Sequence, residues 1–344
     1  MEPTARQWKE LHEAARGIKA MAPWDSLRDQ DFITIQLPGR DEPVFCSVMG
    51  GGGGCYGIGM YPGNEAAARL LRMAHAPEGE PPFIHALMQT CVNCYYGDRE
   101  DLAVAERATL KGLGIKYRGH NQWVYFRSHK EGCPPQPIGR EEAALAIDVL
   151  QNLYMALRAY LEGRLKVDFE KGETLYRWRD EKKEGQWCCA AMPWPEQFHF
   201  AMDAITVSNE EFLAEMNAAK KTGSVLELDL FYLPFPMREK EGGLERCPRR
   251  FLAADAESGL VLGQKTLDWG DEPEDAMLDF LEDWIGENGR PARINMRSVF
   301  TGMLLYDFCQ KTGIDLQMEG IPVLDKLIGE MTGFIGGISR GDFR

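Results

Sequence analysis

The order of strand-like and helix-like segments between residues 225 and 335 most strongly limits what this chain can fold into. Three strand-like segments come first, and helices then alternate with strands. Parallel neighbours need a crossover connection, so residues 292–296 and 314–318 are predicted to be parallel strands of one mixed sheet. The segments in chain order are strands 225–233, 251–254 and 260–267, helix 273–285, strand 292–296, helix 298–310, strand 314–318 and a final helix opened by Pro322.

The first 162 residues follow a different pattern, in which strand-like segments are joined by short turns that contain Gly and Pro. Such turns favour antiparallel neighbours, so residues 1–162 are predicted to form an α+β domain with a largely antiparallel sheet. The polar stretch 162–185 is predicted to be the boundary, with residues 163–344 forming an α/β domain around a mixed sheet. Within the second domain, residues 182–185 are expected at a hairpin tip, and Ser208 is expected to cap a helix.

Composition narrows the classes of function. The chain has 344 residues and a formal net charge of −14, which disfavours binding to a phosphate backbone. Its first residues are polar and amphipathic, and no apolar run approaches the length of a membrane helix, so neither a signal peptide nor a membrane span is predicted. Nine cysteines, an odd number, are expected to be reduced thiols. A cytoplasmic location is the prediction that follows.

The segment order in 225–335 resembles the ribonuclease-H-like core shared by integrases and transposases. Short local similarities at 289–294 and 308–314 accompany it. The resemblance implies carboxylates that converge on two metal ions, with Asp229 on the first strand as the first of them. The second should follow the fourth strand, where this chain has Arg297, a cation that would repel Mg²⁺. Asp255 and Glu330 are weaker candidates, so the resemblance implies the fold with an incomplete set of catalytic carboxylates.

A second resemblance extends over nearly the whole chain. Residues 23–24, 45–50, 57–63 and 113–119 together are similar to an uncharacterised bacterial family of paired domains of unknown function. This resemblance implies a bacterial origin and a two-domain layout. It supplies no activity, ligand or catalytic residue.

One cysteine pair has the spacing of a metal site. Cys91 and Cys94 form a C-x-x-C pair, and His120, His129 and Cys133 follow at irregular distances. Structural zinc sites usually show two compact ligand pairs, so these five residues are weak candidates and no metal is predicted. The glycines at 50–54 lead into a strand pattern rather than a helix, so no phosphate or nucleotide cofactor is predicted either.

These observations favour a non-catalytic binding protein, with another protein as the candidate partner. One alternative is a metal-dependent nuclease or polynucleotidyl transferase of the ribonuclease-H-like class. A further alternative is an enzyme of unknown chemistry with its site in the cleft between the two halves. Residues 271–287 contain eight acidic residues and no Lys or Arg, which is typical of a solvated helix face.

Overall fold

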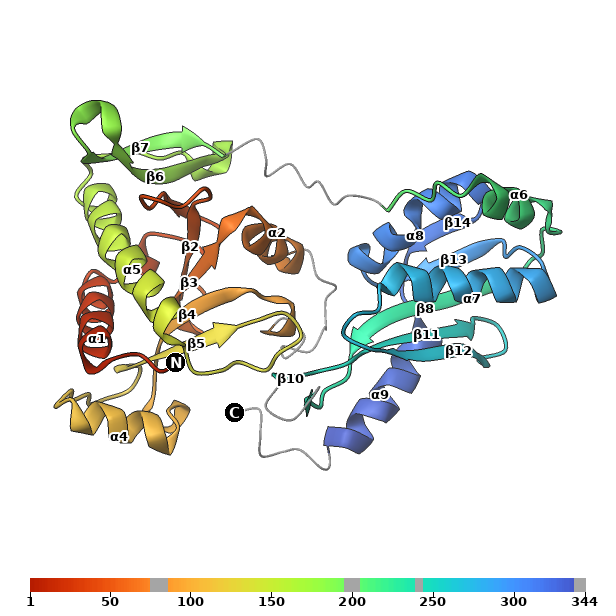
Figure 1. The fold of residues 1–344 in the computed structure, drawn as a ribbon, viewed down its shortest axis with the longest axis horizontal. Helices are drawn as coiled ribbons and strands as arrows, with labels where there is room; N and C mark the ends of the chain where they lie inside the picture. The colour runs from red at the N-terminus through yellow and green to blue at the C-terminus, as the bar shows by residue number, and fades with distance from the viewer. Residues whose placement is uncertain (75–85, 195–204, 239–243, 337–344) are drawn as a thin grey trace. The chain divides into compact units, whose positions relative to one another are not determined.

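The computed structural model describes residues 1–74, 86–194, 205–238 and 244–336, which divide into two compact units (Figure 1). The first unit contains the described residues in 1–71, 89–131 and 135–194. The second contains the described residues from 205 onward and the short segments 72–74, 86–88 and 132–134. Each unit has its own sheet and its own hydrophobic core.

The sheet of the first unit has the strand order β5-β4-β3-β2-β1-β6-β7. Neighbouring strands are antiparallel throughout, except that β1 and β6 are parallel. The predicted α+β class with a largely antiparallel sheet is therefore confirmed. The strands are β1 Ile33–Ile35, β2 Val44–Met49, β3 Tyr56–Pro62, β4 Cys91–Gly97, β5 Trp123–His129, β6 Glu173–Asp180 and β7 Gln186–Pro193.

Helices α1 (Ala5–Ala20) and α5 (Arg140–Leu161) contribute their buried residues to one core cluster with this sheet. The apolar residues of α5 recur at helical spacing, which is why one side of this helix is buried. A second, smaller cluster joins α2 (Gly63–Ala74) to other residues of the sheet. The remaining helices of this unit are α4 Val104–Gly112 and the 3-10 turns η1 Pro23–Asp25, η2 Arg99–Asp101, η3 Phe169–Lys171 and η4 Glu181–Lys183.

The division between the units does not fall at residue 162, where the sequence predicted it. Strands β6 and β7 follow that position, yet β6 pairs with β1 and therefore belongs to the first sheet. The expected hairpin tip at 182–185 does lie between β6 and β7. The polarity of 162–185 thus reflects an exposed connection and hairpin tip within the first unit, and the first unit continues past β7.

The second unit contains a mixed sheet with the strand order β12-β11-β8-β13-β14. Strand β11 is antiparallel to both β8 and β12, whereas β13 is parallel to both β8 and β14. The predicted parallel pairing of the last two strands is therefore confirmed. The strands are β8 Val225–Tyr232, β11 Arg249–Asp255, β12 Val261–Leu267, β13 Arg293–Met296 and β14 Asp315–Met318, with β9 Met237–Arg238 and β10 Glu245–Arg246 in a separate two-stranded ribbon.

Helices contribute to separate clusters on the two faces of this second sheet. Side chains of α6 (Glu210–Ala218), α7 (Pro273–Asn288) and α8 (Val299–Thr312) form one cluster with the sheet, and those of α9 (Pro322–Gly336) form the other. Asn209, rather than the predicted Ser208, caps α6, because its side chain accepts a hydrogen bond from the backbone N–H of Phe212. No helix in the described ranges combines the length and apolarity needed to cross a membrane.

Candidate functional site

Asp229 lies near the middle of β8, the central strand of the second sheet. Alternate residues of a strand point to opposite faces, so Leu228 joins the cluster formed with α7 and α8 while Asp229 points to the opposite face. That is the face covered by α9, because Leu252, directly opposite Asp229 on β11, belongs to the cluster that contains α9 side chains. Asp229 is only 1% exposed. A buried carboxylate of this kind requires a cation or hydrogen-bond donors.

Arg297 supplies the cation. It follows β13, which is parallel to β8, so its side chain starts from the neighbouring strand. One terminal nitrogen, Nη2, donates to Asp229 Oδ2, and the other, Nη1, donates to Asp325 Oδ1 at 3.1 Å. The guanidinium group therefore bridges a buried carboxylate on β8 and a half-exposed one on α9.

Burial and the positive charge of Arg297 change the pKa of Asp229 in opposite directions. Removal of the carboxylate from water is the larger effect and raises its pKa to about 6, although Arg297 favours the ionised form. Two residues earlier on the same face, Glu227 is also buried, and its Oε2 accepts a hydrogen bond of 2.9 Å from the backbone N–H of Leu324. Burial likewise raises the pKa of Glu227. Glu227 thus binds the first turn of α9 and fixes the helix that carries Asp325.

The other two predicted carboxylates lie outside this cluster. Asp255 is opposite Leu226 on β11, three positions from the register of Asp229, so it points to the other face of the sheet. Its carboxylate instead accepts hydrogen bonds from Ser258. Glu330 is exposed on α9, more than one helical turn after Asp325. The prediction of Asp255 and Glu330 as partners of Asp229 was wrong, and Asp325 is the carboxylate that sequence reasoning missed.

Catalysis by two metal ions needs several carboxylates around a space that the ions can enter. Here a guanidinium group occupies the space between Asp229 and Asp325 and already donates to both. No group of three or more His, Cys, Asp or Glu side chains in the described ranges could hold a metal ion. The residues of this site therefore do not fit the metal pair that the ribonuclease-H-like resemblance implies.

The structure brings together only two of the five weak zinc candidates. Cys91 and His129 are directly opposite on β4 and β5 and so share a face of the first sheet. Cys94 is three residues further along β4 and lies in the core on the opposite face. His120 is on the surface, where its Nδ1 lies 2.6 Å from Asp98 Oδ2, and Cys133 belongs to the second unit.

Cys91 instead takes part in a buried polar network. Its Sγ lies 3.2 Å from Gln89 Oε1 and 3.4 Å from Asn93 Oδ1, so the single thiol proton has two acceptors within reach. Asn93 Nδ2 donates to the Tyr95 hydroxyl at 2.7 Å. The Tyr95 hydroxyl is 3.4 Å from His129 Nε2. Burial raises the pKa of the Cys91 thiol well above its usual range, so the thiol stays protonated at neutral pH. These contacts describe a hydrogen-bonded core cluster rather than an activated nucleophile.

Comparisons with known proteins agree with this two-unit architecture. Residues 8–177 match a domain of unknown function (DUF7309), and residues 212–332 match another domain of unknown function (DUF6930). The expected pair of domains of unknown function is thus confirmed. No curated protein matches the chain. Among solved structures, the HTLV-2 integrase catalytic core domain in complex with magnesium, in a dimeric form, is similar over 35% of this chain and 74% of that chain, with 15% sequence identity and a TM-score of 0.22.

Proposed function

We propose that this chain is a binding protein without nuclease or polynucleotidyl transferase activity. The observation that carries this proposal is the position of Arg297, which bridges Asp229 and Asp325. A magnesium ion would need carboxylate oxygens with free lone pairs and a space free of positive charge. The fixed guanidinium group fulfils the electrostatic role of a cation but cannot activate a water molecule for hydrolysis.

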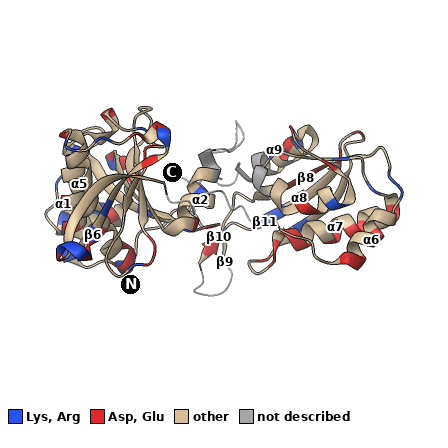
Figure 2. Ribbon diagram, turned by 90° about the horizontal axis from the view of Figure 1, so that it is seen from above, with Lys and Arg blue, Asp and Glu red and all other residues tan. Residues whose placement is uncertain are grey.

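The charge of the second unit also supports a function other than nucleic-acid binding. Along α7, Asp275, Asp279, Asp283 and Glu287 recur every four residues and are all exposed, so they form one acidic stripe. Figure 2 shows acidic residues along α7. A phosphate backbone approaching this helix would meet like charge, and the chain as a whole carries a net charge of −14.

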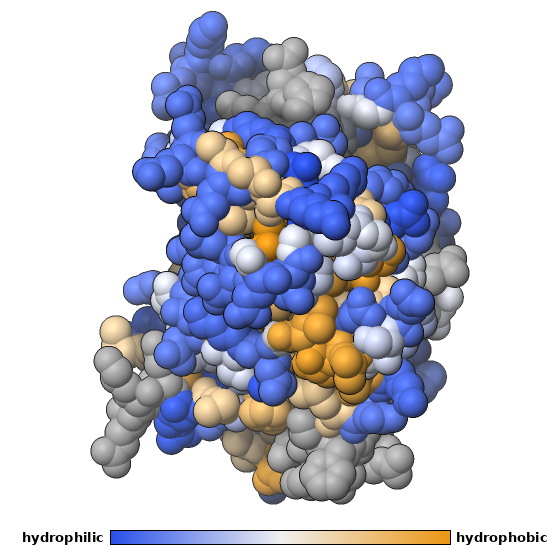
Figure 3. Space-filling model, turned by 90° about the vertical axis from the view of Figure 1, so that its right-hand side faces the viewer, coloured by the Kyte–Doolittle hydropathy of each residue, from blue (hydrophilic) through white to orange (hydrophobic). Residues whose placement is uncertain are grey.

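A protein partner is the class of ligand that we propose. Strand β7 is the last strand in the order of the first sheet, it contains no charged residue, and none of its eight residues is buried. An edge strand with exposed apolar side chains and unpaired backbone groups is a surface to which an extended segment of another protein can add. Figure 3 shows a separate face of the molecule, on which hydrophobic residues gather among mostly hydrophilic ones.

The test is a metal-dependent cleavage assay on the full-length chain. Purified protein is incubated with single- and double-stranded DNA and RNA in the presence of Mg²⁺ or Mn²⁺, and we expect no cleavage. An Asp229→Ala variant distinguishes contamination from intrinsic activity. Robust metal-dependent cleavage by the wild-type chain that disappears in this variant would refute the proposal and establish the nuclease alternative.

A second variant tests the physical reason directly. Arg297→Asp replaces the bridging cation with a carboxylate between Asp229 and Asp325, so three carboxylates would then converge. We expect Mn²⁺ to raise the unfolding temperature of this variant while leaving that of the wild-type chain unchanged. Arg297→Met is the matched control, because it removes the cation without adding a ligand. Equal stabilisation of the wild-type chain by Mn²⁺ would mean that Arg297 does not exclude a metal ion.

A further inference from the structure

A cavity in the first unit lies between α1, α4 and β5, far along the sequence from the site around Asp229. Its volume is about 160 Å³, and its walls are mainly apolar and aromatic. An apolar cavity of about this size is large enough for a single six-membered ring. The main apolar lining residues are Trp8, Leu102, Leu110, Val124, Phe126 and Ile138.

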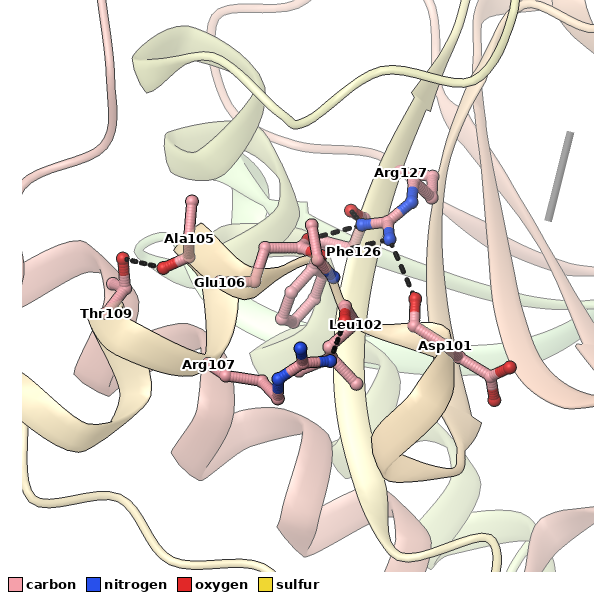
Figure 4. A network of polar contacts seen from close by, with 9 residues as sticks. Asp101, Leu102, Ala105, Glu106, Arg107, Thr109, Phe126 and Arg127 are labelled. Carbon is pink, nitrogen blue, oxygen red and sulfur yellow. Dashed lines mark hydrogen bonds and ion pairs between the residues drawn. The ribbon is translucent and has the colours of Figure 1, made fainter. Parts of the chain in front are cut away.

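One wall of the cavity is held by the contacts of Arg127. This residue follows Phe126 on β5 and pairs with the carboxylate of Glu106 on α4, as Figure 4 shows. Arg127 also donates to the backbone carbonyl of Asp101, just before α4. Glu106 accepts a further hydrogen bond of 2.7 Å from the backbone N–H of Ala103 at the start of α4. The charge of Glu106 is therefore already balanced, and α4 is fixed against the sheet.

His12 is the polar group buried in the opposite wall. It is 4% exposed, and its ring lies among aromatic side chains, with centroids 6.0 Å from Trp8 and 5.6 Å from Phe126. Its Nδ1 is 2.9 Å from the hydroxyl of Tyr117, which does not line the cavity. Nε2 has no hydrogen-bond partner among the residues that the structure describes, and His12 itself lines the cavity.

A buried imidazole that lines an apolar cavity and has one nitrogen without a hydrogen-bond partner among the described residues has the composition of a ligand site, in which a few polar groups orient an apolar molecule. We propose that this cavity binds a small, uncharged, single-ring molecule that carries one hydroxyl group, oriented by a hydrogen bond to His12 Nε2. A hydroxyl group can donate or accept, so it suits either tautomer of the ring. A carboxylate on the ligand would lose its hydration against the mainly apolar walls and would be repelled by Glu2, which also lines the cavity.

The imidazole is suited to such a ligand because it is uncharged at neutral pH. Burial, with a smaller contribution from Arg16, lowers the pKa of His12 to about 4. A neutral ring can lie in this aromatic environment without a counter-ion. The hydrogen bond to the ligand is then one between neutral groups, which predicts a modest gain in affinity over an apolar ring of the same shape.

Phenol and toluene form a matched pair of probes, because they differ only in a hydroxyl and a methyl group. Each is titrated into the full-length chain while NMR follows the His12 imidazole and the Trp8 indole N–H. We expect both probes to shift the Trp8 signal and only phenol to shift the His12 nitrogen signals. We also expect phenol to bind about 2- to 10-fold more tightly than toluene. Benzoate is expected to bind more weakly than either.

Two variants locate the binding. His12→Leu replaces the imidazole with an apolar side chain and should remove the preference for phenol over toluene. Ala105→Phe adds a ring at an exposed lining position of α4 and should weaken binding of both probes. The proposal is overturned if neither probe shifts Trp8 and His12, if the wild-type chain does not prefer phenol, or if Ala105→Phe leaves both affinities unchanged. The comparison of phenol with toluene on the wild-type chain tests the proposal even if the His12 variant does not fold.

Discussion

Replacement of Arg297 by Met tests how the second unit stabilises a buried carboxylate. The substitution keeps a long, flexible side chain but removes the charge, so Asp229 stays 1% exposed with no cation beside it. Loss of a hydrogen bond between charged groups in such a site costs about 1.5–3 kcal/mol. Asp325 is half-exposed, and water can replace its contact with Arg297 at little cost.

The ionisation of Asp229, which depends on pH, supplies the second part of the expected destabilisation. In the wild-type protein the pKa of Asp229 is about 6, raised by burial and opposed by Arg297. Removal of Arg297 raises this pKa further, so the folded variant holds its proton at pH 7, whereas the unfolded chain does not. Between pH 6 and pH 7 Asp229 is largely ionised in both the folded and the unfolded wild-type protein, so the wild-type stability stays nearly constant. The variant loses about 1.4 kcal/mol over this range, because only its unfolded state is ionised. We therefore expect a destabilisation of about 3 kcal/mol at pH 7 that falls by about 1.4 kcal/mol at pH 5.

The assay is hydrogen exchange by mass spectrometry across a urea series, on peptides from β8 and β13 of the full-length chain. It reports the free energy of unfolding of the second unit separately from that of the first. The matched control is Arg293→Met on the same strand, because Arg293 forms an exposed ion pair with Asp315 and its loss should cost at most about 1 kcal/mol. Equal effects of the two substitutions, or an Arg297→Met effect that does not decrease toward pH 5, would refute the reasoning.

Three further predictions follow from burial and backbone geometry. NMR should show His12 titrating near pH 4, and a titration midpoint near 6.5 would contradict this prediction. Because the folded pKa lies below the unfolded value of about 6.5, the free energy of unfolding should fall by up to about 3 kcal/mol as the pH drops from 6.5 to 4. An aromatic disulfide reagent should modify exposed Cys55 in the native protein but buried Cys91 only after unfolding, and equal rates would show that the network around Cys91 is open. Gly289→Ala should lower the unfolding temperature because φ is +87° and the new Cβ would lie 2.6 Å from the backbone oxygen of Lys220, whereas Gly223→Ala, at an open position, should have little effect.

Function depends on the side chains at the site rather than on the order of strands and helices. Arg297, Asp229 and Asp325 make that site an ion-pair cluster. The cavity beside His12 is in the other unit, so the phenol experiment and the cleavage experiment can fail independently.

The local sequence determined most of the elements of this protein. Apolar periodicity predicted α7, and the order of segments after residue 225 predicted a mixed sheet with β13 and β14 parallel. Arg297 could also be recognised from the sequence as incompatible with a metal site, because its charge does not depend on the fold. These features follow from residue type and spacing over one or two neighbouring elements.

Only the tertiary structure decided which distant residues meet. The parallel pairing of β1 with β6 joins residues about 140 positions apart, and no periodicity reports such a contact, so the domain boundary was predicted too early. The register between β8 and β11 places Asp255 on the face of the sheet opposite to that of Asp229. The contact of Glu227 with the start of α9 holds this helix so that Asp325, rather than Glu330, reaches Arg297. A shift of one residue in a strand reverses the face to which a side chain points, and this register is set by the packing of the whole sheet.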